Sequence, residues 1–267
     1  GVYHNAEVHL NGEKIASCPY GYSDFYADLT GKLLPGRDNV LEVIAHNADQ
    51  PNSRWYSGAG IYRPVTLWTA PARHILPDGV QVRTLSIDPA EVEVTVQTTA
   101  SGAVAVAILD GEQTVATAQA ESNGKAVLRV QIPNAKLWSP DSPALYRCRA
   151  MFGDDCAETT FGVRTLSWGD DGFLLNGKRV ILLGACVHHD HGVLGACCYP
   201  EAEERKVRLL QKVGYNAVRC AHNPCSKAFL DACDRLGMLV MDEYADMWYI
   251  HKTQYDYAGY LPDRWRQ

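Results

Sequence analysis

The feature that most constrains the fold is an alternation of apolar strands and amphipathic helices in the last hundred residues. The pattern predicts a hairpin and strand over 173–189, a helix over 200–214, a strand over 215–222, a helix over 225–237 and a strand over 238–244. Strands that alternate with helices through short connections form parallel sheets. This part of the chain is therefore predicted to begin an α/β domain.

Each of the three predicted strands ends in polar side chains. These are His188, His189, Asp190 and His191 after the first strand, residues 219–223 after the second, and Asp242 and Glu243 after the third. Ligands of parallel sheets bind beyond the carboxyl ends of the strands. Three polar strand ends at one edge predict a ligand site, which could serve a metal, a proton transfer or a sugar.

The residues before about position 164 have the alternation and turn punctuation of β structure. A hairpin is predicted about Asn11 and Gly12, since both tolerate the positive φ of a type I′ turn, and a strand is predicted over 61–70. Between positions 72 and 163, short strands recur at a spacing of about 8–12 residues, which is typical of an immunoglobulin-like sandwich.

Composition excludes several classes of function. The net charge is −6 with the charges dispersed, which argues against binding nucleic acid or an anionic membrane surface. No apolar run approaches the ~20 residues of a transmembrane helix. Nine cysteines without a CxxC pair favour reduced thiols and a cytoplasmic location. A zinc site from Cys220, His222 and Cys225 is the alternative, and its spacing lacks a second half.

Four segments closely resemble motifs of glycoside hydrolase family 2, which includes β-galactosidases, β-glucuronidases and β-mannosidases. They are "RWYSGAGIYRPVTL", "NGKRVILLGACVHHDHGVLGA", "GYNAVRCAHNP" and "LVMDEYADMW". The resemblance covers essentially the whole chain. It implies a multidomain β plus α/β fold, with a partial jelly-roll sandwich over 1–71, an immunoglobulin-like β-sandwich over 72–163 and the first three βα units of a (β/α)8 TIM barrel over 164–267.

The resemblance also implies a chemistry, most similar to the β-galactosidase branch. Family members hydrolyse β-glycosides with retention of the configuration at the anomeric carbon. They use two glutamates whose carboxyl groups lie about 5–5.5 Å apart. Both come from later barrel strands, the first within an Asn-Glu pair, and this sequence has no Asn-Glu dipeptide. We therefore expect a segment truncated at both ends that has no catalytic residue and is inactive alone. A carbohydrate substrate, a homo-oligomeric full-length protein and no required cofactor are expected.

Eight residues are predicted to contact the substrate. They are His188, Asp190, Arg219, His222, Asn223, Asp242, Glu243 and Trp248. By resemblance, His188 matches a histidine that contacts the innermost sugar, and Arg219 matches an arginine close to the nucleophile. His222 and Asn223 match the family's HNP motif. The alternatives are a capped core histidine at 188, a loop cap at 190 and packing of the barrel rim by Trp248.

Asp242 and Glu243 could be mistaken for a catalytic pair. Neighbouring strand residues point to opposite faces, so these two cannot flank one glycosidic bond. The resemblance implies binding and support, with Asp242 the better candidate for the pocket. Some family members bind magnesium just beyond this strand through an acidic residue and a histidine. Met247 and Tyr249 occupy roughly those places, so the metal ligands are not matched.

The loop with Arg54, Trp55 and Tyr56 is predicted to reach toward the barrel mouth, as it does in this family. Alternatively, Trp55 and Trp68 fill a sandwich core. Two further functions compete with a β-glycosidase. One is a non-catalytic carbohydrate-binding or scaffold protein, and the other is a metal-dependent hydrolase that uses residues 188–191.

Overall fold

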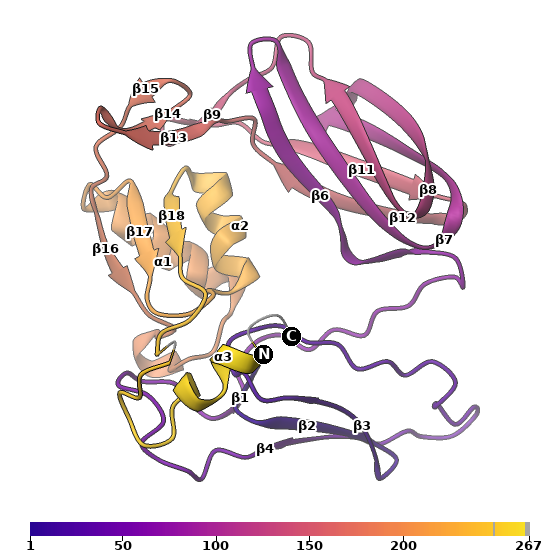
Figure 1. The fold of residues 1–267 in the computed structure, drawn as a ribbon, viewed down its shortest axis with the longest axis vertical. Coiled ribbons are helices and arrows are strands. Elements are labelled where there is room, and N and C mark those ends of the chain that lie inside the picture. The colour runs from indigo at the N-terminus through magenta and orange to yellow at the C-terminus, as the bar shows by residue number, and fades with distance from the viewer. Residues whose placement is uncertain (248, 265–267) are drawn as a thin grey trace. The chain divides into compact units, whose positions relative to one another are not determined.

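The computed structural model describes residues 1–247 and 249–264, which form two compact units (Figure 1). One unit contains residues 1–66, 184–232 and the described residues from 240 onward. The other contains residues 67–183 and 233–239. The N-terminal β segment and the polar strand ends therefore belong to the same unit.

The N-terminal segment forms two small antiparallel sheets. β2 (Ala6–Leu10) lies between β3 (Glu13–Cys18) and β4 (Leu41–Ala45), while β1 (Val2–Tyr3) pairs with β5 (Gly60–Ile61). The predicted hairpin is confirmed, because Leu10 pairs with Glu13 and the two turn residues have φ of +52° and +86°.

The strand predicted over 61–70 is wrong beyond its first residue, since strand β5 ends at Ile61. Pro64 lacks the N–H that a strand donates to its neighbour, which limits pairing along this stretch. Val65 and Leu67 are exposed, so no buried face holds the segment as a strand.

The second unit is built on five antiparallel strands, β6 (Ile75–Ile87), β7 (Ala90–Asp110), β8 (Gln113–Gln131), β11 (Tyr146–Phe152) and β12 (Asp155–Phe161). They follow the order β12-β11-β7-β6, and β8 pairs with β7. Alternate residues of β7 are almost completely buried in the core: Val92, Val94, Val96, Val104, Val106 and Ile108. This period of two is the pattern of a sandwich strand.

The structure has fewer and longer strands here than the expected series of short ones. β7 pairs with β6 through its first half and with β11 through its second half. The pairing with β8 shifts between Gln97 and Ser101, next to Gly102, whose φ is +154°. A residue without Cβ reaches this conformation, so the strand changes direction without ending.

The second unit also contains five short strands. They are β9 (Trp138–Ser139), β10 (Ser142–Pro143), β13 (Leu166–Gly169), β14 (Gly172–Leu175) and β15 (Lys178–Arg179). β9 pairs with β10, and β14 lies between β13 and β15. Trp138 is fully buried and donates its indole N–H to the carbonyl of Asp234 at 2.8 Å.

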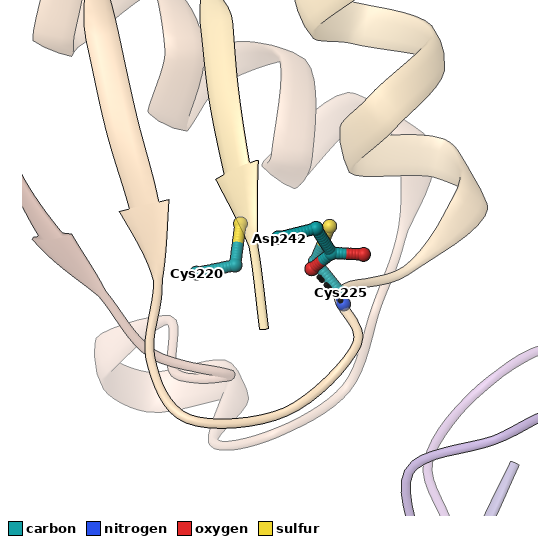
Figure 2. A group of neighbouring side chains, drawn as sticks. All are labelled: Cys220, Cys225 and Asp242. Carbon is teal, nitrogen blue, oxygen red and sulfur yellow. Dashed lines mark hydrogen bonds between the residues drawn. The ribbon is translucent and has the colours of Figure 1, made fainter. Parts of the chain in front are cut away.

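The predicted strand–helix alternation is confirmed. Its elements are β16 (Gly184–Val187), α1 (Pro200–Lys212), β17 (Ala217–Cys220), α2 (Lys227–Leu236) and β18 (Leu239–Asp242). The sheet order is β16-β17-β18, β16 and β17 are parallel, and Figure 2 shows β17 and β18 running in the same direction. Two 3-10 turns, η1 (Gly192–Leu194) and η2 (Tyr257–Gly259), and helix α3 (Leu261–Arg264) complete the described chain.

Helix α1 has the expected signals at its ends. Pro200 starts it, Glu201 and Glu203 lie in its first turn and Lys212 lies in its last turn, which complements the helix dipole. Strand β16 begins later than the apolar sequence predicts, and Ile181, Leu182 and Leu183 before it are exposed. No helix in the described part of the chain is long and apolar enough to cross a membrane.

Candidate functional site

Four of the predicted site residues gather where the parallel strands end. Arg219 donates from Nε to Oε1 of Glu243. A residue near the end of β17 and the residue that follows β18 therefore form an ion pair. His222 Nδ1 lies 3.5 Å from the other carboxylate oxygen of Glu243. The rings of His188 and His222 have centroids 5.4 Å apart. Two imidazoles, a guanidinium and a carboxylate therefore share one edge of the sheet.

Trp55 brings an aromatic face from the N-terminal segment to this edge. Its ring centroid lies 4.9 Å from that of His222 and 6.3 Å from that of His188, and its plane is within 22° of the His188 ring. The indole N–H donates to the hydroxyl of Tyr22 at 2.9 Å, which fixes the ring. Trp55 thus contacts the histidines at the edge and also packs against the aromatic core beneath them. These side chains, Trp55, His188, Arg219, His222 and Glu243, are called the edge cluster below.

The aromatic core beneath the edge cluster consists of Tyr3, Tyr20, Tyr22 and Tyr62, packed with Ala196 and Cys198. Tyr20 places its hydroxyl 2.8 Å from the Tyr244 carbonyl and 2.9 Å from Oδ1 of Asn223. Asn223 is 2% exposed. The predicted substrate residue Asn223 is therefore held inside the protein by Tyr20.

Arg63 is a second support that the prediction of site residues did not include. Its guanidinium is buried and donates to the carbonyls of Tyr22 at 2.8 Å and Pro224 at 2.7 Å. It thereby ties the N-terminal segment to the loop after β17, which carries His222. The signal was present in the motif "SGAGIYRPVTL", but nothing in that motif indicates which carbonyls its arginine reaches.

Burial keeps two histidines of this region neutral. His189 stacks on Tyr22 with ring centroids 5.4 Å apart, and burial lowers the pKa of His189 to about 3. Burial also lowers the pKa of His222, which outweighs the opposite effects of Asp246 and Glu243. A neutral His222 has one N–H donor and one acceptor nitrogen at neutral pH.

His191 belongs to a buried charged cluster rather than to the edge. Glu203 of α1 is 3% exposed and accepts from the Ser226 hydroxyl at 3.0 Å. His191 Nε2 lies 3.2 Å and Lys206 Nζ lies 3.6 Å from the second oxygen of Glu203. Lys206 also donates to the carbonyl of His188 at 3.1 Å. This cluster anchors the loop after β16 from behind.

Three predicted residues remain, which are Asp190, Asp242 and Trp248. Asp190 is exposed. Asp242 accepts from the backbone N–H of Cys225 at 3.1 Å, whereas Glu243 accepts from Arg219. The expectation that Asp242 and Glu243 point to opposite faces stays a prediction, with which their different partners agree. The preference for Asp242 as the pocket residue stays a prediction, and the geometry favours Glu243. Trp248 lies outside the described residues.

A cleft continues from the edge cluster along the segment after β18. It is lined by Arg219, Glu243, Tyr244, Ala245, Asp246, Tyr249, Leu261 and Pro262. Arg54 donates to Asp246 at 3.0 Å, and Lys252 donates to the other oxygen. Burial raises the pKa of Asp246, but the hydrogen bonds from Lys252 and Arg54 outweigh it and leave the pKa below its ordinary value.

The two places that correspond to magnesium ligands in some family members do not fit a hard cation. Met247 is buried and offers a thioether, and Tyr249 is exposed and offers a phenol. Magnesium prefers carboxylate and water oxygens. Asp246 is a carboxylate nearby, but both of its oxygens are already paired with cations.

A β-sandwich followed by parallel strand–helix units with converging polar side chains is the build of multidomain enzymes that carry an α/β barrel. Comparison with protein-family models supports this class. The model described as "Glycosyl hydrolases family 2, TIM barrel domain" matches residues 167–255, and that described as "Glycosyl hydrolases family 2" matches residues 78–164. The chain belongs to glycoside hydrolase family 2.

Known proteins align with 91–100% of the chain. A β-galactosidase of Bacteroides ovatus is 39% identical over 100% of this chain and 34% of its own length. A family 2 member from Bacteroides cellulosilyticus has a TM-score of 0.89 at 38% identity, over 99% of this chain and 37% of that one. A β-glucuronidase of Faecalibacterium prausnitzii has a TM-score of 0.78 at 32% identity, over 91% of this chain and 46% of its own. The chain spans about a third to a half of these relatives.

Proposed function

We propose that this chain is a segment of a retaining β-glycosidase that hydrolyses terminal β-linked sugars, and that β-galactosides are its substrates. The observation that carries the proposal is the edge cluster, in which Trp55 faces His188 and His222 beside the Arg219–Glu243 pair. Membership in glycoside hydrolase family 2 supports the class of reaction.

Each member of the edge cluster has a chemistry that suits a sugar. The face of Trp55 offers an apolar surface for the C–H face of a pyranose ring. A neutral His222 both donates to and accepts from hydroxyl groups. Arg219 orients Glu243 by pairing with one of its carboxylate oxygens, so that the other carboxylate positions accept from sugar hydroxyls. These groups bind and orient a substrate.

The bond cleavage itself needs two carboxylates about 5–5.5 Å apart, one as acid and base and one as nucleophile. The sequence has no Asn-Glu pair, within which the family carries its acid and base. Glu243 is paired with Arg219, and Asp242 accepts from the backbone N–H of Cys225. We therefore propose that the 267 residues contribute substrate contacts and are inactive alone.

A neutral sugar is favoured over a uronic acid by the charges around the edge cluster. A sugar carboxylate is bound by Arg or Lys through charge-assisted hydrogen bonds. Among the described residues of this region, Arg219 is paired with Glu243, Arg54 and Lys252 with Asp246, and Lys206 with Glu203. The name of the Bacteroides ovatus relative agrees with this preference.

The experiment is a panel of chromogenic β-glycosides with the protein made from the complete reading frame that contains this segment. We expect the β-galactoside to be cleaved with the highest kcat/KM, and the 267-residue chain to cleave none of the panel. Preference for the β-glucuronide would refute the proposal that β-galactosides are the substrates. Carbohydrate binding without turnover would indicate a non-catalytic protein. The same preparation tests two expectations that follow from the resemblance. Light scattering tests whether the protein is a homo-oligomer, and an activity assay after dialysis against a chelator tests whether it needs a cofactor.

A further inference from the structure

Two thiols and a carboxylate from three neighbouring segments meet at the carboxyl ends of β17 and β18 (Figure 2). Cys220 ends β17, Cys225 lies in the loop before α2 and Asp242 ends β18. Both Sγ atoms and a carboxylate oxygen of Asp242 all lie within 4.8 Å of one another. The backbone N–H of Cys225 donates to Asp242 at 3.1 Å, which holds the carboxylate toward the thiols.

We propose that Cys220, Cys225 and Asp242 form a binding site for a thiophilic divalent cation, with Zn²⁺ as the natural occupant. Zinc binds thiolates at about 2.3 Å and carboxylate oxygens at about 2.0–2.2 Å in a tetrahedron. Such a tetrahedron separates two sulfurs by roughly 3.8 Å and a sulfur from an oxygen by roughly 3.5 Å. The two sulfurs therefore need to approach by about 1 Å at most, and a sulfur and the oxygen by about 1.3 Å at most, which side-chain rotation supplies.

The donor set selects the class of metal. Two of the three donors are sulfur, which suits zinc and other soft or borderline cations and disfavours magnesium and calcium. Three protein ligands leave the fourth position of the tetrahedron to a water molecule. Binding releases the thiol protons to solvent, so the bound form has two Zn–S bonds and one Zn–O bond.

This site differs from the zinc alternative that the sequence suggested. His222 stands between the two cysteines in sequence, but its ring contacts Trp55 and its Nδ1 faces Glu243. The third ligand is Asp242, which comes from the next strand. Sequence spacing within one loop could not reveal a ligand that parallel pairing of two strands brings into place.

The proposed site is separate from the edge cluster and does not depend on the proposed function. Cys220 adjoins Arg219 within β17, Asp242 adjoins Glu243 at the end of β18, and consecutive residues of an extended chain point to opposite faces. A bound metal would join the ends of β17 and β18 to the loop between them. We therefore expect metal binding to stabilise the fold and not to require a sugar ligand.

The test is a titration of the reduced, metal-free 267-residue chain with Co²⁺, followed by competition with Zn²⁺. We expect one Co²⁺ per chain, with thiolate charge-transfer absorption and the visible bands of a tetrahedral complex, which Zn²⁺ then abolishes. Cys225→Ser should weaken binding on the order of 100-fold, and Asp242→Asn about 10-fold. Cys156→Ser, which removes an exposed cysteine from β12, is the matched control and should bind as the parent does.

A second measurement covers variants that fold poorly. Zn²⁺ should raise the Tm of the parent chain and of Cys156→Ser, but not that of Cys225→Ser, because a ligand stabilises only the state that binds it. The proposal is overturned if Co²⁺ gives no thiolate band, or if Cys225→Ser and Asp242→Asn both bind as tightly as Cys156→Ser. Sub-stoichiometric binding that each cysteine variant reduces equally would indicate adventitious thiol binding and would also overturn it.

Discussion

His189 and Arg63 show how much a single buried polar residue determines in this protein. His189 stacks on Tyr22 and is 7% exposed, so its imidazole stays neutral in the folded chain. Arg63 is also 7% exposed and satisfies two carbonyls from different segments. Neither residue belongs to the edge cluster, yet both support the loops that carry it.

The stability of the chain should fall on acidification because of His189. The pKa of His189 is about 3 in the folded chain, against 6.5 for an unperturbed histidine. Below pH 6.5 the unfolded state therefore binds more protons than the folded state, and stability is lost as the pH falls toward 3, by at most about 1.4 kcal/mol per pH unit. Urea unfolding midpoints between pH 7 and pH 4.5 measure this slope.

His189→Gln should flatten that slope, since it removes the titrating group. A smaller slope should remain, because burial also lowers the pKa of His4. His46→Gln is the matched control, as the His46 side chain is 56% exposed. If the unfolding free energy of His189→Gln falls with pH as steeply as that of His46→Gln, the argument from burial of His189 is contradicted.

Arg63→Ala should lower the free energy of unfolding by about 2–3 kcal/mol, because it leaves two carbonyls without a charged donor. Arg129→Ala on the exposed face of β8 removes the same side chain and should change stability by less than about 0.5 kcal/mol. Equal effects of the two substitutions, measured by urea unfolding at pH 7, would show that the Arg63 contacts do not stabilise the fold.

At the residue scale, the sequence predicts which residues lie at the site better than what each one does. Alternation along a strand is enough to separate Asp242 from Glu243. It does not reveal which of the two faces the edge cluster, because that depends on the side from which Trp55 and the loop after β17 approach. The structural role of Asn223 likewise depends on Tyr20, which is distant in sequence.

Elements were predicted well where local chemistry decides and less well where pairing decides. The Asn11-Gly12 hairpin and both helices follow from turn residues and helix-end signals. The length of β7 does not, because a glycine that could end a strand instead lets it bend between two partners. The start of β16 at Gly184 also depends on pairing, because its register with β17 begins there.

Gly184→Ala should weaken the pairing of β16 with β17. A Cβ built at Gly184 would lie 2.0 Å from the carbonyl oxygen of Ala217, which is backbone and cannot rotate away. We expect a loss of about 1–3 kcal/mol in the free energy of unfolding. Gly169→Ala is the matched control, because no atom lies within 4 Å of the added methyl group. Coinciding thermal melts of the two variants would refute the close approach between residue 184 and the carbonyl of Ala217.

At the scale of the whole molecule, the α/β part depends on the N-terminal segment. Most of the α/β part lies in the same compact unit as this segment, and the aromatic core that joins them takes its tyrosines from positions 3, 20, 22 and 62. Family resemblance predicted the order of the domains. It did not predict this core, because its members are scattered over segments that have no common pattern.

Residues 165–267 expressed alone should therefore aggregate or be partly disordered. Excision removes the four tyrosines of the aromatic core, so the groups that pack against them become exposed in addition to Ile181, Leu182 and Leu183, which are exposed already. Size-exclusion chromatography and thermal melting of this segment, with the 267-residue chain as control, provide the measurement. A monomer that melts cooperatively would contradict the prediction.

The central claim is that the carboxyl edge of the parallel sheet is one wall of a sugar-binding pocket. The most direct test is the kcat/KM of the protein made from the complete reading frame toward an aryl β-galactoside, with His222→Ala and Glu243→Gln compared with His46→Ala. Loss of one polar substrate contact should lower kcat/KM about 10–100-fold in each of the first two variants, while His46→Ala stays within about twofold. Folded His222→Ala and Glu243→Gln variants with unchanged kcat/KM would contradict the claim.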